Sequence, residues 1–513
     1  MSTQKPPIGP PPTPFTFRLF IGVLGIFIGA VMAGLNNRVG SLALVDIRGV
    51  FGIGADEGTW INTVYIAAEL VAMPFSVWLA TTFSLRRFHI FVVACFTVLA
   101  IMMPLMPDLT SLLILRTLQG FMGGLLIPVL MAGALRFFPL PIKLYGLALY
   151  AMTATFSPNL AIWLNAQWVD VIFDWKLVYW QVIPVAFIVM AMVAWGIPQD
   201  PIRLERLAHV NWLGAICALA GLSMLAIGLD QGARMDWTRS NLFCWLIGGG
   251  ISSIAIFLLS EWFHSTPFIK PQLLGRRNIA ITCLLLPCIL IVFLSGSLLP
   301  SMYLERIWVY RSLQIAPIGL LIALPQLLIA FAVARLLYTK WIDARIVFSL
   351  GLGLISISCL FGSQLTLEWL VSEFVTIQIL QAFGQPMAIV SLLFLSTSVV
   401  QPAEGPFIAG TINTVRALGT LLGGAVMSYF LTMRERFHSE ILLDHLGSMN
   451  HTLPEKSDVA ILVKTLSQQS FILANADTYL FLGLCALALI PLVLSMQHIY
   501  PPSLSTKTVT KLA

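Results

Sequence analysis

The chain has 513 residues, of which 58% are hydrophobic and only 10% are charged, and its formal net charge is +6. A soluble globular domain carries about 25% charged residues, so this composition excludes a soluble protein and indicates an integral membrane protein. The basic residues are scattered singly between apolar runs, which argues against a nucleic-acid-binding surface.

The first 14 residues, MSTQKPPIGPPPTP, are polar and rich in proline, and they predict a flexible tail. The apolar run that follows is too long for a cleaved signal peptide. Crossing a bilayer takes about 20 apolar residues. By this criterion we predict an all-α integral membrane protein with 14 transmembrane helices. These spans lie near residues 16–38, 58–80, 88–107, 110–135, 144–165, 177–198, 210–230, 240–262, 279–303, 312–336, 346–364, 371–398, 406–433 and 475–497.

An even number of spans leaves both termini on the same side of the membrane. If that side is the cytoplasm, sixteen basic residues fall on it and seven fall in the short segments opposite. The positive-inside rule therefore predicts that both termini are cytoplasmic. A long loop at 434–473 would then lie on the outer side.

Charged residues stand inside predicted spans at Glu69, Arg116 and Arg416. A charge at the bilayer centre costs at least about 2.5–3.5 kcal/mol on insertion scales, so each is a candidate functional residue. A carboxylate held in apolar surroundings near an arginine is poised to take up and release a proton. We predict that Glu69 and Arg116 serve proton coupling. The alternative is that Glu69 is a static partner of Arg38 or Arg116, and that the arginine serves packing alone.

Neutral polar residues inside spans are candidates for lining a substrate cavity or for hydrogen bonds between helices. Together with two arginines, the cavity candidates are Asn36, Arg38, Gln119, Gln378, Gln381, Asn413 and Arg416. Glycines spaced four residues apart favour close helix packing. They occur at Gly120 and Gly124, and again at Gly419 and Gly423.

Two segments suggest an internal repeat. LILRTLQGFMGG (113–124) and VTIQILQAFGQP (375–386) share the pattern Leu-Gln-small-Phe, and each falls in the fourth of six spans once spans 7 and 8 are set aside. Transporters with two related halves bind substrate near the midplane, between the halves. We therefore expect a tail at 1–14, an N-terminal half at 15–200, two additional helices at 201–265, a C-terminal half at 266–498 and a second cytoplasmic tail at 499–513.

No motif of an enzyme is present: the sequence has no Walker loop, no metal-ligand cluster and no hydrolase elbow. The seven cysteines lie in or beside apolar runs without metal-binding spacing. We therefore expect no enzyme activity, no cofactor and no metal. Transport would draw its energy from an ion gradient or from the gradient of the substrate itself.

Several segments, in chain order, carry a family resemblance. They are DEGTWINTVYIAAELVAMP (56–74, with Glu69), RTLQGFMGGLLIP (116–128), DWKLVYWQVIP (174–184), LDQGARMDW (229–237), SEWFHSTPFIKPQLLGRRN (260–278) and TINTVRALGTLLGG (411–424). Together they resemble the major facilitator superfamily, and within it the 14-spanning drug:proton antiporters of the EmrB/QacA type. The resemblance implies the major facilitator fold and proton-coupled efflux of drugs or toxicants from a bacterial inner membrane. For EmrB-type members it also implies a periplasmic adaptor and an outer-membrane channel as partners.

The sequence departs from this family at three places. In LNNRVGS (35–41), Asn36 stands where a carboxylate is expected, and Arg38 adds a positive charge. The loop after the second span keeps only the basic pair Arg86 and Arg87, and the antiporter motif of helix 5 is reduced to SPNLAIWLNAQ (157–167). Two alternatives stay open: an exporter of an anionic metabolite, siderophore or organic acid on the same fold, or a membrane sensor or scaffold that transports nothing.

Overall fold

A computed structural model describes residues 15–42, 44–139, 141–448 and 459–500. These residues form helices and connections without a strand, and 14 of the helical segments are long and apolar enough to cross a membrane. The predicted all-α fold with 14 spans is thereby confirmed. The helices are α1 (Phe17–Leu42), α2 (Leu44–Phe51), α3 (Ala55–Phe83), α4 (Leu85–Met102), α5 (Leu109–Phe137), α6 (Lys143–Ala166), α7 (Lys176–Trp180), α8 (Val182–Gly196), α9 (Trp212–Gln231), α10 (Asn241–Phe263), α11 (Arg277–Trp308), α12 (Ser312–Leu337), α13 (Ala344–Gly362), α14 (Val375–Thr397), α15 (Gly405–Ser448) and α16 (Val459–Leu494).

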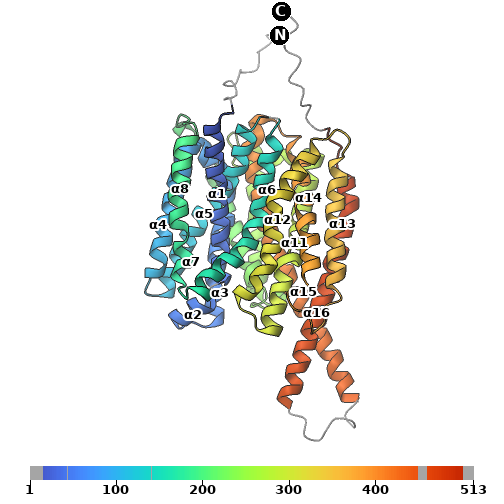
Figure 1. Cartoon of the computed structure of the whole chain (residues 1–513). Coiled ribbons are helices and arrows are strands. Elements are labelled where there is room, and N and C mark those ends of the chain that lie inside the picture. The colour runs from blue at the N-terminus through green and yellow to red at the C-terminus, as the bar shows by residue number, and fades with distance from the viewer. Residues whose placement is uncertain (1–14, 43, 140, 449–458, 501–513) are drawn as a thin grey trace, which may run out of the picture.

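The axes of the long helices are roughly aligned in one bundle (Figure 1). One group comprises α1 and α3 to α8, and a second comprises α11 to α16; the two groups meet along the pairs α6–α12 and α3–α15. We call these groups the N-half and the C-half. Helix α1 begins and α16 ends at the same end of the bundle, which we call the terminal side, and we call the opposite end the distal side (Figure 1).

The prediction of a loop at 434–473 is wrong for most of its length. Helix α15 continues to Ser448 and α16 already begins at Val459, so both helices project beyond the bundle on the distal side (Figure 1). Their base is held by an ion pair between Arg434 and Asp477 at 2.5 Å and by a hydrogen bond between His438 and Asp477 at 2.7 Å. The expected boundary followed the first charged residues, whereas a helix ends only where its backbone pattern is broken.

Glycines bring α5 directly onto α3. A Cβ atom at Gly120 would collide with the backbone carbonyl of Tyr65, and one at Gly124 would collide with that of Glu69. On the other half, a Cβ at Gly419 would lie 2.7 Å from the Cα of Pro287 on α11. These backbone contacts leave room only for glycine. They fix α5 at the turn of α3 that carries Glu69.

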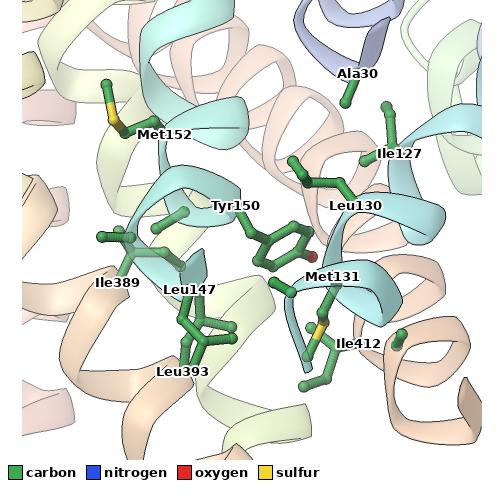
Figure 2. Close-up of a cluster of buried hydrophobic side chains, with 14 of the residues drawn as sticks. Ala30, Ile127, Leu130, Met131, Leu147, Tyr150, Met152, Ile389, Leu393 and Ile412 are labelled. Carbon is green, nitrogen blue, oxygen red and sulfur yellow. The ribbon is translucent and has the colours of Figure 1, made fainter. Parts of the chain in front are cut away.

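The two halves are closed against each other toward the terminal side. Figure 2 shows Leu130 and Met131 of α5 and Leu147 of α6 in one buried cluster with Leu393 of α14 and Ile412 of α15. We call this cluster the terminal plug. Within it, the Tyr150 hydroxyl donates a hydrogen bond to Oδ1 of Asn413 at 3.0 Å, which links α6 to α15.

Replacing Tyr150 by phenylalanine is expected to weaken the terminal plug without changing its packing. The lost bond between the halves is worth about 0.5–1.5 kcal/mol, so the population open on the terminal side rises about 2- to 12-fold. The measurement is the rate at which Leu147→Cys, in a background without other cysteines, reacts with an impermeant maleimide from the terminal side. An unchanged rate would show that this bond does not hold the plug shut.

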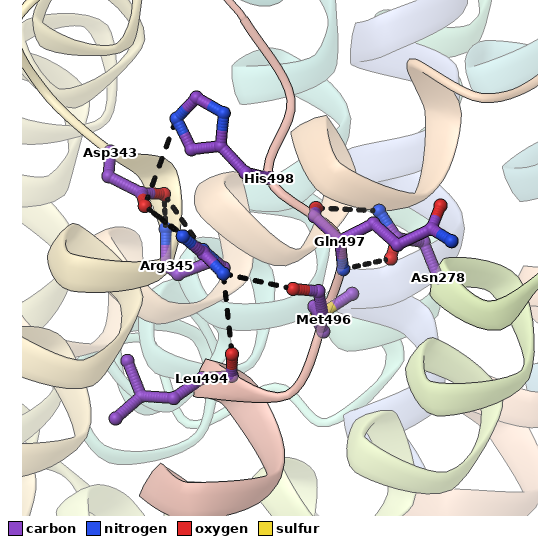
Figure 3. Close-up of polar contacts among 7 residues, drawn as sticks. All are labelled: Asn278, Asp343, Arg345, Leu494, Met496, Gln497 and His498. Atoms are coloured by element: carbon purple, nitrogen blue, oxygen red, sulfur yellow. Dashed lines mark hydrogen bonds and ion pairs between the residues drawn. The ribbon is translucent and has the colours of Figure 1, made fainter.

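A second polar cluster fastens the terminal side of the C-half (Figure 3). Arg345 donates to the carbonyls of Leu494 and Met496 at 3.4 and 3.2 Å and pairs with Asp343 at 2.6 Å. Asn278 exchanges two hydrogen bonds with the backbone of Gln497. Partial burial raises the pKa of the Asp343 carboxyl, but the interactions with Arg345 lower it by a larger amount. The pKa of Asp343 therefore lies below its ordinary value. The ends of α11, α13 and α16 are therefore joined as one unit.

Candidate substrate cavity and proton-coupling site

A cavity of about 350 Å³ lies between the halves, from the middle of the bundle toward the distal side. Its wall includes Gly34, in the distal half of α1, and Arg416, twelve residues into α15 from the terminal side, and it reaches Trp237 in the distal connection after α9. Much of the wall is apolar. The apolar part includes Ile66, Met73, Leu290, Phe293, Leu294 and Leu298. Such a wall suits an amphiphilic molecule.

Four charged side chains line the cavity in the part of the chain that the structure describes: Arg38, Glu69, Asp230 and Arg416. Glu69 is buried on α3 and accepts a hydrogen bond from Nδ2 of Asn37 on α1. Arg416, Arg116 and Arg38 all lie close enough to interact with its charge. Glu69 is therefore a carboxylate between two adjoining helices, facing the cavity and surrounded by positive charge.

Arg116 is completely buried and does not line the cavity. Its Nη1 donates to Oδ1 of Asn36 at 2.5 Å and to Oε1 of Gln119 at 2.8 Å, and its Nη2 donates to the Asn36 carbonyl at 2.9 Å. The guanidinium also lies 3.9 Å from the centre of the Tyr65 ring. Neutral acceptors and an aromatic face thus hold this cation, and no ion pair joins it to Glu69 within the described residues.

Arg416 reaches across the cavity from the C-half to the N-half. Its Nη1 donates to the hydroxyl of Thr153 on α6 at 2.8 Å, and its guanidinium lies 5.3 Å from the centre of the Tyr150 ring. Tyr150 is in turn bonded to Asn413, one turn earlier on α15. The wall of the cavity and the terminal plug are therefore connected through these two side chains.

Five of the predicted cavity residues lie outside the cavity wall and are buried between helices: Asn36, Gln119, Gln378, Gln381 and Asn413. For four of these residues, a hydrogen-bond partner between the helices explains why the side chain does not reach the cavity. Asn36 and Gln119 are occupied by Arg116, and Gln381 donates to the hydroxyls of Ser295 and Ser358 at 2.9 and 2.7 Å. Asn413 donates a hydrogen bond to the Ala409 carbonyl and accepts one from the Tyr150 hydroxyl. Only Arg38 and Arg416 of the predicted set line the cavity.

Sequence reasoning missed two residues that the structure places beside the predicted ones. Asn37, and not Asn36, bonds Glu69, because consecutive helical residues point about 100° apart. The available signal was the doublet in LNNR (35–38). Asp230, in the last turn of α9, lines the cavity although we had set its helix apart from the two halves. Its signal was a carboxylate at the end of an apolar run.

Comparison with known proteins agrees with this architecture. Residues 26–313 match the model of the Major Facilitator Superfamily. The chain belongs to the major facilitator superfamily. Members of this superfamily are transporters and not enzymes. The 14 spans and bacterial relatives of the EmrB type imply a bacterial inner membrane.

Among the similar proteins, the multidrug export protein EmrB of Haemophilus influenzae is 22% identical over 508 residues, covering 94% of this chain and 96% of that protein. The fatty acid resistance protein FarB of Neisseria gonorrhoeae is also 22% identical, covering 92% and 94%. These relatives confirm the resemblance to the EmrB type. The crystal structure of the human organic anion transporter MFSD10 aligns with a TM-score of 0.58 at 13% identity, covering 94% of this chain and all of that one, and supports the fold.

Proposed function

We propose that this protein is a proton-coupled exporter of amphiphilic small molecules, such as drugs or toxicants, and that it works by alternating access. The observation that carries the proposal is Glu69, a buried carboxylate on the wall of an apolar cavity between the two halves. A carboxylate in that place can exchange a proton for substrate as the cavity changes sides. The names of the EmrB relatives support export of drugs.

In the orientation that the basic residues predict, the terminal side is cytoplasmic and the cavity lies toward the outer side. A proton from outside neutralises Glu69. The halves can then close, because burying a neutral acid costs much less than burying a charge. When the terminal plug opens, Glu69 loses its proton to the cytoplasm, and an amphiphilic substrate binds against the freed carboxylate and the apolar wall. Arg416 and Tyr150 connect the charge of Glu69 to the plug.

The test is substrate-induced proton flux in inverted membrane vesicles, recorded with a fluorescent dye for the pH gradient. Cationic, neutral and anionic amphiphiles are added in turn to wild type, Glu69→Gln and the control Glu57→Gln, which alters an exposed carboxylate on the same helix. A substrate is expected to collapse the gradient in wild type and control but not in Glu69→Gln. No response to any compound in wild type would favour a non-transporting scaffold. Equal responses in all three proteins would remove Glu69 from the mechanism.

An anionic cargo is the second candidate, because Arg38 and Arg416 also line the cavity. The two candidates differ in the sign of the coupling. A cation or neutral donor competes with the proton for Glu69, whereas an anion between the arginines binds better once Glu69 is neutral. Proton and anion would then move together, so export of the anion would be driven by the anion's own gradient and not by the proton gradient. In the vesicle assay, a proton flux in the same direction as an anionic compound would therefore favour this second candidate.

We also propose that the projecting part of α15 and α16 is where the adaptor implied by the resemblance would dock, since it extends furthest on the distal side (Figure 1). No residue beyond Ser428 of α15 lines the cavity within the described residues. Replacing residues 441–466 by a short Gly/Ser linker is therefore expected to leave flux in vesicles unchanged but to abolish drug resistance of whole cells. Normal resistance in cells with this variant would exclude the projection as the docking site.

A further inference from the structure

The two additional helices have a defined place in the bundle. Helix α9 packs against α3 of the N-half and α15 of the C-half, while α10 packs on the outside of α9. At the distal end, Trp237 stacks edge-on against Tyr429 of α15 at 5.4 Å between ring centres. The last turn of α9 therefore reaches the cavity, where it contributes Asp230.

Asp230 belongs to a hydrogen-bond cluster centred on Thr63 of α3. The Thr63 hydroxyl contacts Oδ2 of Asp230 and lies 3.1 Å from the Thr59 carbonyl. It also accepts from Nε2 of Gln231 at 2.6 Å. A threonine hydroxyl has one proton to donate and can accept two hydrogen bonds. It cannot donate to both Asp230 and Thr59 at once.

Two complete arrangements of this cluster follow, and they differ by one proton. When Asp230 is charged, the Thr63 hydroxyl donates to its carboxylate. When Asp230 is protonated, the acid donates to Thr63, and Thr63 turns its own proton to the Thr59 carbonyl. In both arrangements Thr63 still accepts from Gln231, so neither leaves the hydroxyl without a partner. The cluster can thus gain or lose a proton at Oδ2 by rotation of one hydroxyl.

We propose that Asp230 is a second proton-binding carboxylate of the transporter, supplied by the additional helix α9, so that two protons enter for each substrate exported. The inference rests on the proposed function and extends it to stoichiometry. Thr63 and Glu69 lie six residues apart on α3, about 9 Å along its axis, with Thr63 nearer the distal side. A proton from the distal solution binds Oδ2 of Asp230, and a second binds Glu69. Both leave as protons on the terminal side.

The charged surroundings of Asp230 come from several elements. Arg38 on α1, Glu69 on α3 and Arg416 on α15 line the same cavity, and no charged residue of α10 does so in the described chain. Arg234, one turn further along, donates to the Asp56 carbonyl at 3.1 Å and is therefore partly engaged elsewhere.

The experiment measures the substrate gradient that a pH difference of about one unit sustains in proteoliposomes whose membrane potential is clamped to zero. The probe is whichever of ethidium, chloramphenicol and laurate responds most strongly in wild type. Each coupled proton multiplies the gradient by about ten per pH unit. Wild type is expected to sustain about a 100-fold gradient, Asp230→Asn about a 10-fold gradient, and Asp230→Glu the wild-type gradient. The control Asp236→Asn, an exposed carboxylate paired with Arg239 in the same connection, is expected to match wild type.

The outcomes separate this proposal from the proposed function. If wild type sustains no gradient, the proposed function fails and the second proton fails with it. A wild-type gradient that Asp230→Asn leaves intact, or that is only about 10-fold in wild type, overturns the second proton alone. If Asp230→Asn also abolishes substrate exchange in the absence of a pH difference, that variant is inactive and cannot report the number of protons. The variant Thr63→Val then tests the proposal. We expect that variant to keep exchange and lose about tenfold in gradient, and a full gradient would overturn the proposal.

Discussion

Gly124→Ala is expected to destabilise the N-half and to uncouple proton flux from substrate. The added methyl group would meet the Glu69 carbonyl and, at 2.9 Å, the Cβ of Ala72, and neither atom can turn aside as the end of a flexible side chain can. Overpacking of this kind costs about 1–3 kcal/mol. Because the displaced backbone is that of Glu69 itself, its carboxylate leaves Asn37 and the cavity wall. The measurement is the melting temperature in detergent, together with flux in vesicles.

The matched control is Gly353→Ala on α13, where an added Cβ meets no atom within 4 Å. Alanine is favoured over glycine in a helix by about 1 kcal/mol, so this variant is expected to melt at or slightly above the wild-type temperature. Equal melting temperatures for the two variants would show that α3 and α5 are not in backbone contact in the folded protein.

Arg116→Lys is expected to lose both stability and coupling, although it preserves the charge. The guanidinium donates to three acceptor atoms on Asn36 and Gln119 and lies over the Tyr65 ring. A lysine ammonium is a compact charge that cannot reproduce this planar fork. Hydrogen bonds to charged groups contribute about 1.5–3 kcal/mol each, so losing even one is a large fraction of the stability of a protein. Thermal unfolding and vesicle flux measure the two effects separately.

Arg136→Lys, at the terminal end of the same helix, is the control for Arg116. Arg136 is exposed and pairs with Asp200 at 2.7 Å, and exposed pairs of this kind contribute about 0–1 kcal/mol. We therefore expect this control to resemble wild type in both measurements. If Arg116→Lys behaved in the same way, the buried fork would have no role beyond carrying a charge.

The number and order of the spans could be predicted because bilayer thickness sets a length that hydropathy detects. The projection of α15 and α16 could not, since its charged helices look like a solvated loop once the apolar run ends. Glu69 and Arg416 were predicted because a charge in an apolar run is conspicuous at any rotation of the helix. The choice between Asn36 and Asn37 depends on rotation alone, and residues 19–35 before them are all apolar, so the sequence of α1 shows no polar face that would reveal the rotation.

The close packing of α5 on α3 determines how the electrostatic field at Glu69 changes during transport. Backbone contacts at Gly120 and Gly124 bind these helices into one rigid body, and Arg116 is tied through Asn36 to α1. Glu69, Arg38 and Arg116 therefore keep their separations whenever the halves rock. Arg416 belongs to the other body, so its distance from Glu69 changes with every cycle. Arg38 and Arg116 therefore form a constant positive background at Glu69, whereas the contribution of Arg416 depends on which side of the membrane is open.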